Sequence, residues 1–311
     1  MKSQDAVTDA TPIDLGLNTP IEHRWIDVGE VTLHVALAGP ETGRPLILLH
    51  GFPEAWFGWR HQIDALVGAG FRLAIPDQRG YNLSEKPAGV KAYALPRLAA
   101  DVAGLATALG WTQYRVIGHD WGAAVVWQLV ETPPPGLLAA AVINVPELRV
   151  MLRHVYRTRQ FFRSLYILFF QLPWLPEWAL CRKNGEILAQ RLVDSSKPGT
   201  FGPEELEGYR RAWARPGAMQ AQLGWYRSGA RRPPPKRRQG PVEVPMLILW
   251  GEQDQFLGKE MVSPSAACVR HVEVVRFPDA THWVAHEEPA AVNAALVDFF
   301  GRQDAPPTPP G

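Results

Sequence analysis

The chain has 311 residues, of which 46% are hydrophobic and 20% are charged, and its formal net charge is +1. That length suits one large domain, and the near-neutral charge gives no general reason to expect nucleic acid or an anionic membrane as a partner. With only two cysteines a disulfide framework is unexpected, and the polar N-terminus lacks the apolar core of a signal peptide. The most apolar window, 165–172, is far shorter than the roughly 20 residues of a membrane span. We expect a soluble, cytoplasmic protein, either a monomer or a homodimer.

The first part of the chain alternates predicted strands and helices. Residues 1–20 have no periodic apolar pattern, whereas residues 25–38 alternate apolar and polar side chains around a glycine, as in a β-hairpin. A continuous apolar run at 45–50 predicts a strand buried on both faces of a parallel sheet. A helix at 56–67 and a strand at 71–77 follow.

The same rhythm continues with a helix at 95–109, a strand at 115–117 with a helix behind it, and a strand at 138–145. This alternation predicts an α/β fold with a mostly parallel central sheet and helices on both faces. Functional sites in such folds form at the carboxyl ends of the strands. The polar residues at these ends are His50, Asp77, Asp120 and Asn144.

Between residues 146 and 240 the strand rhythm disappears. Aromatic residues and arginines recur there with helical spacing, as in 204–213 and 219–226, which predicts an inserted α-helical lid. The lid ends in a basic segment with three prolines, 231–238. Such a segment is more typical of a stiff, solvated connection than of a site for an acidic partner.

Strands are predicted again at 244–250 and 272–277, and an amphipathic helix at 289–300 precedes a proline-rich tail. The predicted organisation is a flexible N-terminal arm (1–20), the first part of the core (21–145), the lid (146–240), the second part of the core (241–301) and a disordered tail (302–311).

The segment 113–124 carries the most informative short motif. A β-branched run ends at Gly118, a second glycine stands at Gly122, and Asp120 lies between them at the start of a helical run. This is the strand, tight turn and helix of a nucleophile elbow, because glycines allow close backbone approach beside a strained central residue. Asp120 could instead simply cap the helix, since aspartate is a preferred N-cap residue.

An aspartate nucleophile differs chemically from the serine that an elbow often carries. A carboxylate can displace a leaving group at a saturated carbon and form an alkyl ester, whereas a serine hydroxyl suits attack on a carbonyl. The expected substrate is therefore an alkylating electrophile, such as an epoxide or an alkyl halide.

Hydrolysis of an alkyl ester requires a base for water and an acid that orients the base. Asp254 and His282 each follow one of the later predicted strands. Nucleophile, acid and histidine thus occur in the chain order of an α/β-hydrolase triad. Glu252 or Asp279 could take the orienting role in place of Asp254.

His282 and His286 have the spacing of paired metal ligands on a helix. No glutamate lies between them and residues 283–285 supply no third ligand, so we expect no metal. The chain has no P-loop and no dinucleotide fingerprint, and we expect no cofactor. We expect His119 to pack under the elbow and His50 to have a structural role.

Three segments together resemble the α/β-hydrolase-fold epoxide hydrolases. They are His-Gly-Phe-Pro-Glu-Ala-Trp at 50–56, Asp-Gln-Arg-Gly-Tyr at 77–81 and Gly-His-Asp-Trp-Gly at 118–122. The resemblance covers nearly the whole chain and implies the α/β-hydrolase fold, with an oxyanion hole formed by the backbone N–H groups of Phe52 and Trp121. Ester hydrolysis builds negative charge on a carboxyl oxygen of the nucleophile itself, so such a hole is reasonable.

The resemblance also implies two lid tyrosines as proton donors, and Tyr166 and Tyr226 stand in matching contexts. A phenol with a pKa near 10 is protonated at neutral pH and can donate its proton as an epoxide opens. Both tyrosines could instead be packing residues of a helical lid. We expect Phe52, Trp121 and Phe170 to contact the substrate, a small apolar epoxide.

We therefore predict an epoxide hydrolase in which Asp120 forms a covalent ester while Tyr166 and Tyr226 protonate the epoxide oxygen. His282, oriented by Asp254, then activates water and releases a vicinal diol. The nearest alternative is a haloalkane or haloacid dehalogenase of the same fold, because Asp-Trp-Gly also occurs at the nucleophile of haloalkane dehalogenases. A catalytically silent binding protein of this fold is less consistent with a complete set of nucleophile, base and acid.

The chain departs from the family pattern at two places. Gly224 stands where asparagine is common, and Pro146 and Glu147 stand where a Pro-His pair is common. Neither departure involves the predicted triad, but both leave the shape of the substrate pocket open.

Overall fold

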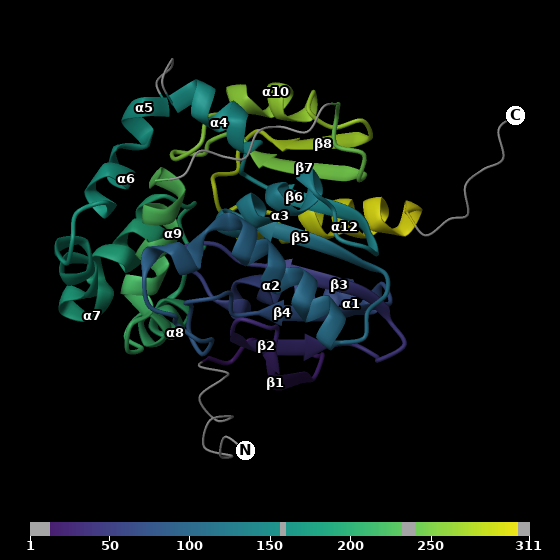
Figure 1. Ribbon diagram of the computed structural model, residues 1–311, viewed down its shortest axis with the longest axis horizontal. Helices are drawn as coiled ribbons and strands as arrows, with labels where there is room; N and C mark the ends of the chain where they lie inside the picture. The colour runs from purple at the N-terminus through teal and green to yellow at the C-terminus, as the bar shows by residue number, and fades with distance from the viewer. Residues whose placement is uncertain (1–12, 156–159, 232–239, 304–311) are drawn as a thin grey trace, which may run out of the picture.

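An eight-stranded sheet forms the centre of the molecule (Figure 1). The computed structural model describes residues 13–155, 160–231 and 240–303. In sheet order the strands are β1 (Ile21–Asp27), β2 (Thr32–Ala38), β4 (Phe71–Pro76), β3 (Arg44–Leu49), β5 (Tyr114–His119), β6 (Leu137–Ile143), β7 (Met246–Gly251) and β8 (Val272–Phe277). β2 pairs antiparallel with β1 and β4, and all adjacent pairs from β4 to β8 are parallel. The predicted hairpin and mostly parallel sheet are therefore confirmed.

The sheet is buried on both faces, and the side chains of β3 alternate between two hydrophobic clusters. Leu46 and Leu48 belong to one cluster, and Ile47 and Leu49 belong to the other, as the two-residue period of a strand requires. One cluster includes residues of α1 (Arg60–Gly68) and α12 (Pro289–Arg302), and the other includes residues of α2 (Leu95–Ala108) and α3 (Trp121–Glu131). Helices therefore cover both faces, as the continuous apolar run of β3 predicts.

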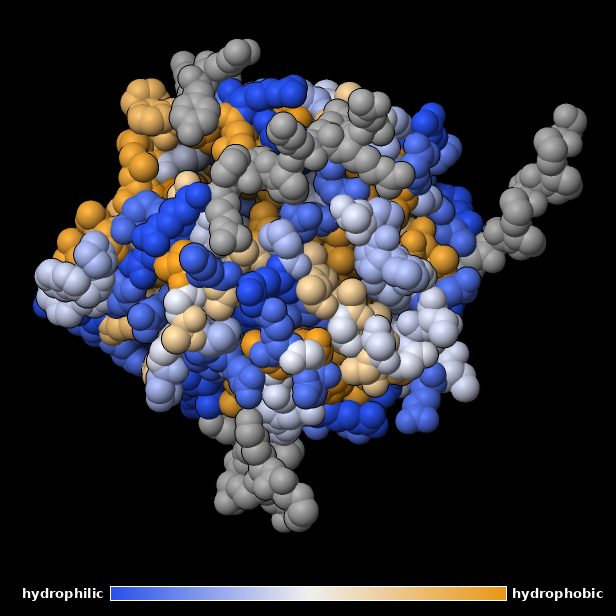
Figure 2. All heavy atoms as spheres, viewed as in Figure 1, coloured by the Kyte–Doolittle hydropathy of each residue, from blue (hydrophilic) through white to orange (hydrophobic). Residues whose placement is uncertain are grey.

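The chain between β6 and β7 is helical in its described part. These helices are α4 (Leu148–Val155), α5 (Gln160–Arg163), α6 (Leu165–Phe170), α7 (Leu175–Asp194), α8 (Pro203–Trp213) and α9 (Ala218–Arg231). In Figure 1, α6 to α9 lie together at one end of the sheet, on the left of the view. Figure 2 shows an apolar surface on this side of the molecule. The large apolar side chains that are exposed in this part of the chain include Phe162, Leu168 and Trp174. The predicted helical insertion agrees with this arrangement.

Five short elements connect the larger ones: η2 (Trp56–Trp59), η3 (Val90–Tyr93), η4 (Lys259–Met261), α10 (Val262–Ala266) and α11 (Val284–Glu287). Among the described residues, none of the helices has both the length and the apolar character that crossing a membrane requires.

The described part of the predicted N-terminal arm lies against the core. The backbone N–H groups of Asn18 and Thr19 both donate to the carboxylate of Asp64, at 2.9 Å. Ile13 and Leu17 also pack against a core cluster. Residues 1–12, most of the basic segment 231–238 and the tail from 304 lie outside the described residues.

The turn between β5 and α3 sets the position of Asp120. Its backbone has φ 48° and ψ −122°, an unfavourable conformation for a residue with a side chain. A Cβ atom on Gly118 would lie 2.3 Å from the carbonyl oxygen of Gly122, and one on Gly122 would lie 2.1 Å from that of Leu49. The turn therefore requires both glycines, as the motif predicts.

We expect Gly122→Ala to destabilise the protein by about 1–3 kcal/mol or more, because the new methyl group overlaps backbone atoms that cannot easily move. Thermal denaturation should show a lower Tm. Gly68→Ala is the matched control, since a Cβ there meets nothing within 4 Å and an alanine favours a helix by about 0.5–1 kcal/mol. An unchanged Tm for Gly122→Ala would contradict the described packing of the turn.

Candidate active site

Asp120, His282 and Asp254 lie in one row at the carboxyl ends of the parallel strands. His282 Nε2 is 3.5 Å from Asp120 Oδ2, and His282 Nδ1 is 2.7 Å from Asp254 Oδ2. The imidazole and the Asp254 carboxylate are buried, whereas 17% of the Asp120 side chain is exposed. The structure thus brings together three residues that are far apart in the sequence, with the imidazole between two carboxylates.

Asp254 is fixed by hydrogen bonds to both carboxylate oxygens. Oδ2 accepts from Asn144 Nδ2 at 2.8 Å in addition to its contact with His282. Oδ1 accepts from the backbone N–H groups of Phe256 and Leu257, at 2.7 and 2.9 Å. These partners leave the carboxylate little freedom to rotate, so it can hold the imidazole in one orientation.

Neither of the other acids that the sequence offered lies in this position. Glu252 makes ion pairs with Lys259 and Arg276, at 3.0 and 3.1 Å. Asp279 is exposed. The geometry therefore favours Asp254 as the partner of His282.

The two carboxylates change the acidity of the histidine. Burial alone would lower the pKa of His282, but Asp254 and Asp120 outweigh that effect and raise the pKa to about 10. Burial would likewise raise the pKa of Asp254, yet contact with His282 and Asn144 lowers it. The His282–Asp254 pair is therefore an imidazolium and a carboxylate at neutral pH.

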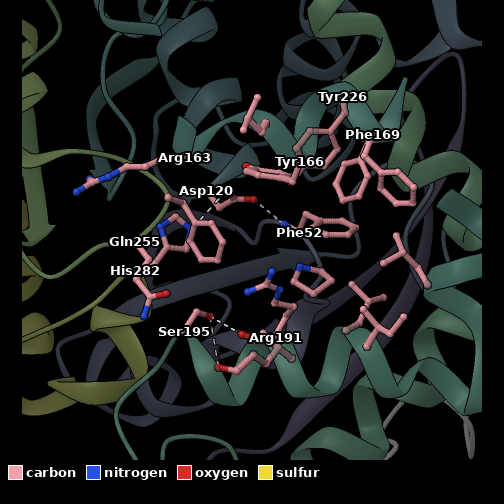
Figure 3. A pocket seen from close by; sticks show the side chains of 18 of the residues that line it. Phe52, Asp120, Arg163, Tyr166, Phe169, Arg191, Ser195, Tyr226, Gln255 and His282 are labelled. Atoms are coloured by element: carbon pink, nitrogen blue, oxygen red, sulfur yellow. Dashed lines mark hydrogen bonds and ion pairs between the residues drawn. The ribbon is translucent and has the colours of Figure 1, made fainter. Parts of the chain in front are cut away.

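Asp120 Oδ1 accepts a hydrogen bond from the backbone N–H of Phe52, at 2.7 Å (Figure 3). This N–H is one of the two predicted oxyanion donors. In the described part of the chain, no hydrogen bond joins the backbone N–H of Trp121 to the Asp120 carboxylate. A second donor at Trp121 thus stays a prediction.

A cavity of about 520 Å³ lies between this row and the lid, and Asp120 and His282 line it. Tyr166 and Tyr226 line it as well, so both predicted tyrosines face the same space as the carboxylate (Figure 3). Phe52 packs edge-on against Tyr226 with ring centroids 5.3 Å apart. Aromatic side chains from the core and the lid therefore enclose the reactive groups.

Two of the three residues predicted to contact substrate, Phe52 and Phe170, line the cavity. Trp121 is not among its lining residues. The reason is that the Trp121 indole packs edge-on against Tyr226, with centroids 5.0 Å apart, and against Trp225 at 5.8 Å. Trp121 therefore lies beside Tyr226, and its direct contact with a substrate stays a prediction.

Both tyrosines are held in the protonated form. Burial raises the pKa of Tyr226 well above 10, and Tyr166 and Asp120 raise it further. Burial and then the Asp120 charge also raise the pKa of Tyr166. Each hydroxyl is thus a hydrogen-bond donor at neutral pH, within the electrostatic influence of Asp120.

Comparison with known proteins identifies the family. Residues 44–289 match the model of the α/β hydrolase fold. The chain is 38% identical to AB hydrolase superfamily protein YfhM of Bacillus subtilis, over 91% of this chain and 99% of that protein. It is 33% identical to mouse epoxide hydrolase 4, over 92% of this chain and 81% of that protein. A crystal structure of Bacillus megaterium epoxide hydrolase with an inhibitor superposes with a TM-score of 0.80 and 28% identity, covering 89% of this chain and all of that one.

The chain belongs to the α/β-hydrolase-fold epoxide hydrolase family. The predicted fold and family are confirmed, and the protein is a hydrolase. The roles of the individual site residues stay predictions.

A buried polar cluster behind the triad was not predicted. Glu54 contacts His119 Nδ1 at 3.1 Å, His286 Nε2 at 2.8 Å and the Tyr209 hydroxyl at 2.9 Å. Burial would raise the pKa of Glu54, but His286 and His119 hold it well below its usual range. His119 also contacts the backbone oxygen of His282 through Nε2, at 2.9 Å. The cluster therefore connects the elbow of the hydrolase to the loop of its candidate base, and it gives His286 a carboxylate partner.

The two departures from the family pattern have structural explanations. A Cβ on Gly224 would lie 2.6 Å from the ring of Tyr93, so the larger asparagine does not fit there. Glu147 accepts hydrogen bonds from the backbone N–H groups of Arg149 and Val150 and stabilises the start of α4. Neither residue lines the cavity.

The raised pKa of His282 gives a testable dependence on pH. The folded-state pKa of about 10 lies above the ordinary value of 6.5, so the stabilisation from the charged imidazole is complete below pH 6.5. It is lost as the pH rises from 6.5 towards 10. We expect NMR titration of the His282 ring to give a pKa near 10, and Asp254→Asn to lower that pKa by at least about one unit, since it removes one of two nearby charges. A wild-type pKa near 6.5 would contradict the described charge arrangement.

Proposed function

We propose that the protein is an epoxide hydrolase that opens an apolar epoxide to a vicinal diol through a covalent ester on Asp120. The observation that carries this proposal is the cavity in which Asp120 and His282 face Tyr166 and Tyr226. A carboxylate nucleophile requires an alkylating substrate, and two protonated phenols suit a leaving group that needs a proton. The relatives named epoxide hydrolase give independent support.

In the first step a carboxylate oxygen of Asp120 attacks one carbon of the epoxide ring. Oδ1 is held by the Phe52 N–H, so Oδ2, which faces His282, is the attacking oxygen. The carbon–oxygen bond of the ring breaks, and the departing oxygen takes a proton from Tyr166 or Tyr226. The products are an alkyl ester on Asp120 and a tyrosinate.

In the second step the imidazolium of His282 first passes its proton, through water, to the tyrosinate. The neutral Nε2 then removes a proton from water, and the hydroxide adds to the ester carbonyl carbon. The negative charge then develops on Oδ1, where the Phe52 N–H already donates. Collapse of this intermediate releases the diol oxygen, which takes the proton of the newly formed Asp120 carboxyl group. Asp120 is then a carboxylate, His282 an imidazolium and both tyrosines are phenols, so the free enzyme is restored.

The change in charge on Asp120 prepares His282 for the second step. In the free enzyme both Asp120 and Asp254 raise the pKa of His282. Esterification neutralises Asp120, so the pKa of His282 falls when the ester forms. A neutral imidazole, the form that can accept a proton, is then easier to reach.

The alternative, a dehalogenase, requires a donor for the departing halide. The candidate from the sequence is the Trp121 indole, but Trp121 is not among the residues that line the cavity. The cavity instead presents tyrosine hydroxyls above Asp120. These observations favour an epoxide over a halide.

The direct test is incubation with styrene oxide and, separately, with 1-bromobutane. We expect diol from the epoxide and no bromide from the alkyl halide. Replacing both Tyr166 and Tyr226 by phenylalanine should lower kcat for styrene oxide by about 100-fold or more, because the departing oxygen loses its proton donors.

Tyr114→Phe is the control, since the buried Tyr114 hydroxyl has no hydrogen-bond partner among the described residues and its removal should leave kcat unchanged. Bromide release without diol formation would overturn the proposal in favour of a dehalogenase. Full activity of the double variant would remove the tyrosines from the mechanism.

A further inference from the structure

The end of α7 turns one helical face towards the cavity. Ile187, Leu188, Arg191 and Leu192 all line the cavity, at the spacing that places residues on one side of a helix. Leu188 and Leu192 are buried, as expected of an apolar cavity wall. Arg191 lies on the same face but is exposed, so its guanidinium stands where the cavity meets solvent.

Arg191 has no acidic partner in the described structure. Across residues 13–155, 160–231 and 240–303, no carboxylate lies within ion-pair distance of its guanidinium. Figure 3 shows the side chain rising from α7 into the cavity, towards Phe52, on the side opposite Tyr166 and Tyr226. The cation thus points at the space that a substrate would fill, and not at a protein group.

The last turn of α7 is fixed in place. The Ser195 hydroxyl donates to the backbone oxygen of Arg191 at 2.6 Å and accepts from the Trp283 indole at 2.9 Å. Because Trp283 directly follows His282, this contact ties Arg191 to the loop of the candidate base. The backbone from which the Arg191 side chain reaches the cavity therefore has a defined position relative to the reactive groups.

The charges that line the cavity do not balance. Asp120 is its only lining carboxylate among the described residues, whereas Arg163 and Arg191 both line it as cations. Arg163 donates one hydrogen bond to the backbone oxygen of Asp254, at 3.3 Å. A neutral carbonyl oxygen gives one N–H group a partner but does not neutralise the positive charge of the guanidinium. The charge of protonated His282 is offset by Asp254, so Asp120 and the two arginines leave one net positive charge, which an anionic ligand would neutralise.

We propose that Arg191 is a specificity-determining residue that binds a carboxylate on the substrate, so that the preferred substrate is an epoxide carrying a separate carboxylate group. The proposal rests on epoxide hydrolysis as the proposed function. A carboxylate fits a guanidinium because its two oxygens can accept two parallel N–H donors. The rest of the cavity, with Phe169, Phe170 and Ile187, suits the apolar body of such a molecule.

The test compares 4-oxiranylbenzoate with 4-oxiranylbenzamide, which have the same ring and epoxide but differ in charge. For each variant, the ratio of the two kcat/KM values cancels any effect of the substitution that both substrates share. We expect the wild type to favour the acid, and Arg191→Met to lower the acid-to-amide ratio about tenfold, mainly through KM. This magnitude allows for solvent screening of a partly exposed charge.

Two further variants separate recognition from general damage. Arg191→Lys keeps the charge and should retain part of the preference. Arg182→Met removes an exposed arginine from the same helix outside the cavity lining and should leave the ratio unchanged. A ratio that is unaffected by Arg191→Met, or that falls equally in Arg182→Met, would overturn the inference.

Binding without turnover distinguishes this inference from the proposed function. Calorimetry with 4-ethylbenzoate and 4-ethylbenzamide, which have no epoxide, should show at least about fivefold tighter binding of the acid to the wild type and equal binding to Arg191→Met. Diol formation with no acid preference in either experiment would refute the carboxylate site and leave the epoxide hydrolase standing. Acid-selective binding without any diol would refute the enzyme activity and retain the anion site.

Discussion

The conformation of one residue, Asp120, determines how the rest of the site is built. Its positive φ, at the turn from β5 to α3, brings the carboxylate against Gly51, where a Cβ would lie 2.5 Å from Oδ1. Only a glycine allows this approach, and it lets the next N–H, that of Phe52, reach Oδ1 at 2.7 Å. Oδ2 is left facing His282 and the cavity. A strained turn thus gives the two oxygens of one carboxylate different environments.

The charged side chains of Asp120, Asp254 and His282 lie in a largely apolar enclosure, and the proposed chemistry depends on the strength of their interactions there. Aromatic side chains surround Asp120 and His282, so charges interact more strongly there than in water. The free site is stabilised by an imidazolium between two carboxylates, and the proposed ester would neutralise one of them. The proposed binding of a substrate carboxylate by Arg191 would add an ionic contact where this enclosure meets solvent.

The fold was largely predictable because its signals are local or periodic. The continuous apolar run at 45–50 predicted the buried strand β3, and polar residues after later strands placed Asp254 and His282 at the same edge. The lid was predicted only as helical, because periodicity does not specify which helix faces meet. Trp121 was for this reason expected in the cavity, whereas Tyr226 of the lid packs over it. The role of Asn144 depends on contacts between strands that are distant in sequence, and its position at a strand end was the one available signal.

Single-turnover hydrolysis in water enriched in oxygen-18 tests the covalent ester on Asp120 most directly. With enzyme in excess over styrene oxide, water should attack the ester carbonyl carbon, so the label should enter the Asp120 carboxylate and the diol should contain none. Mass spectrometry of the peptide that contains Asp120 and of the diol measures both. Label in the diol, with none in Asp120, would mean that water attacks the epoxide directly and would contradict the proposed mechanism.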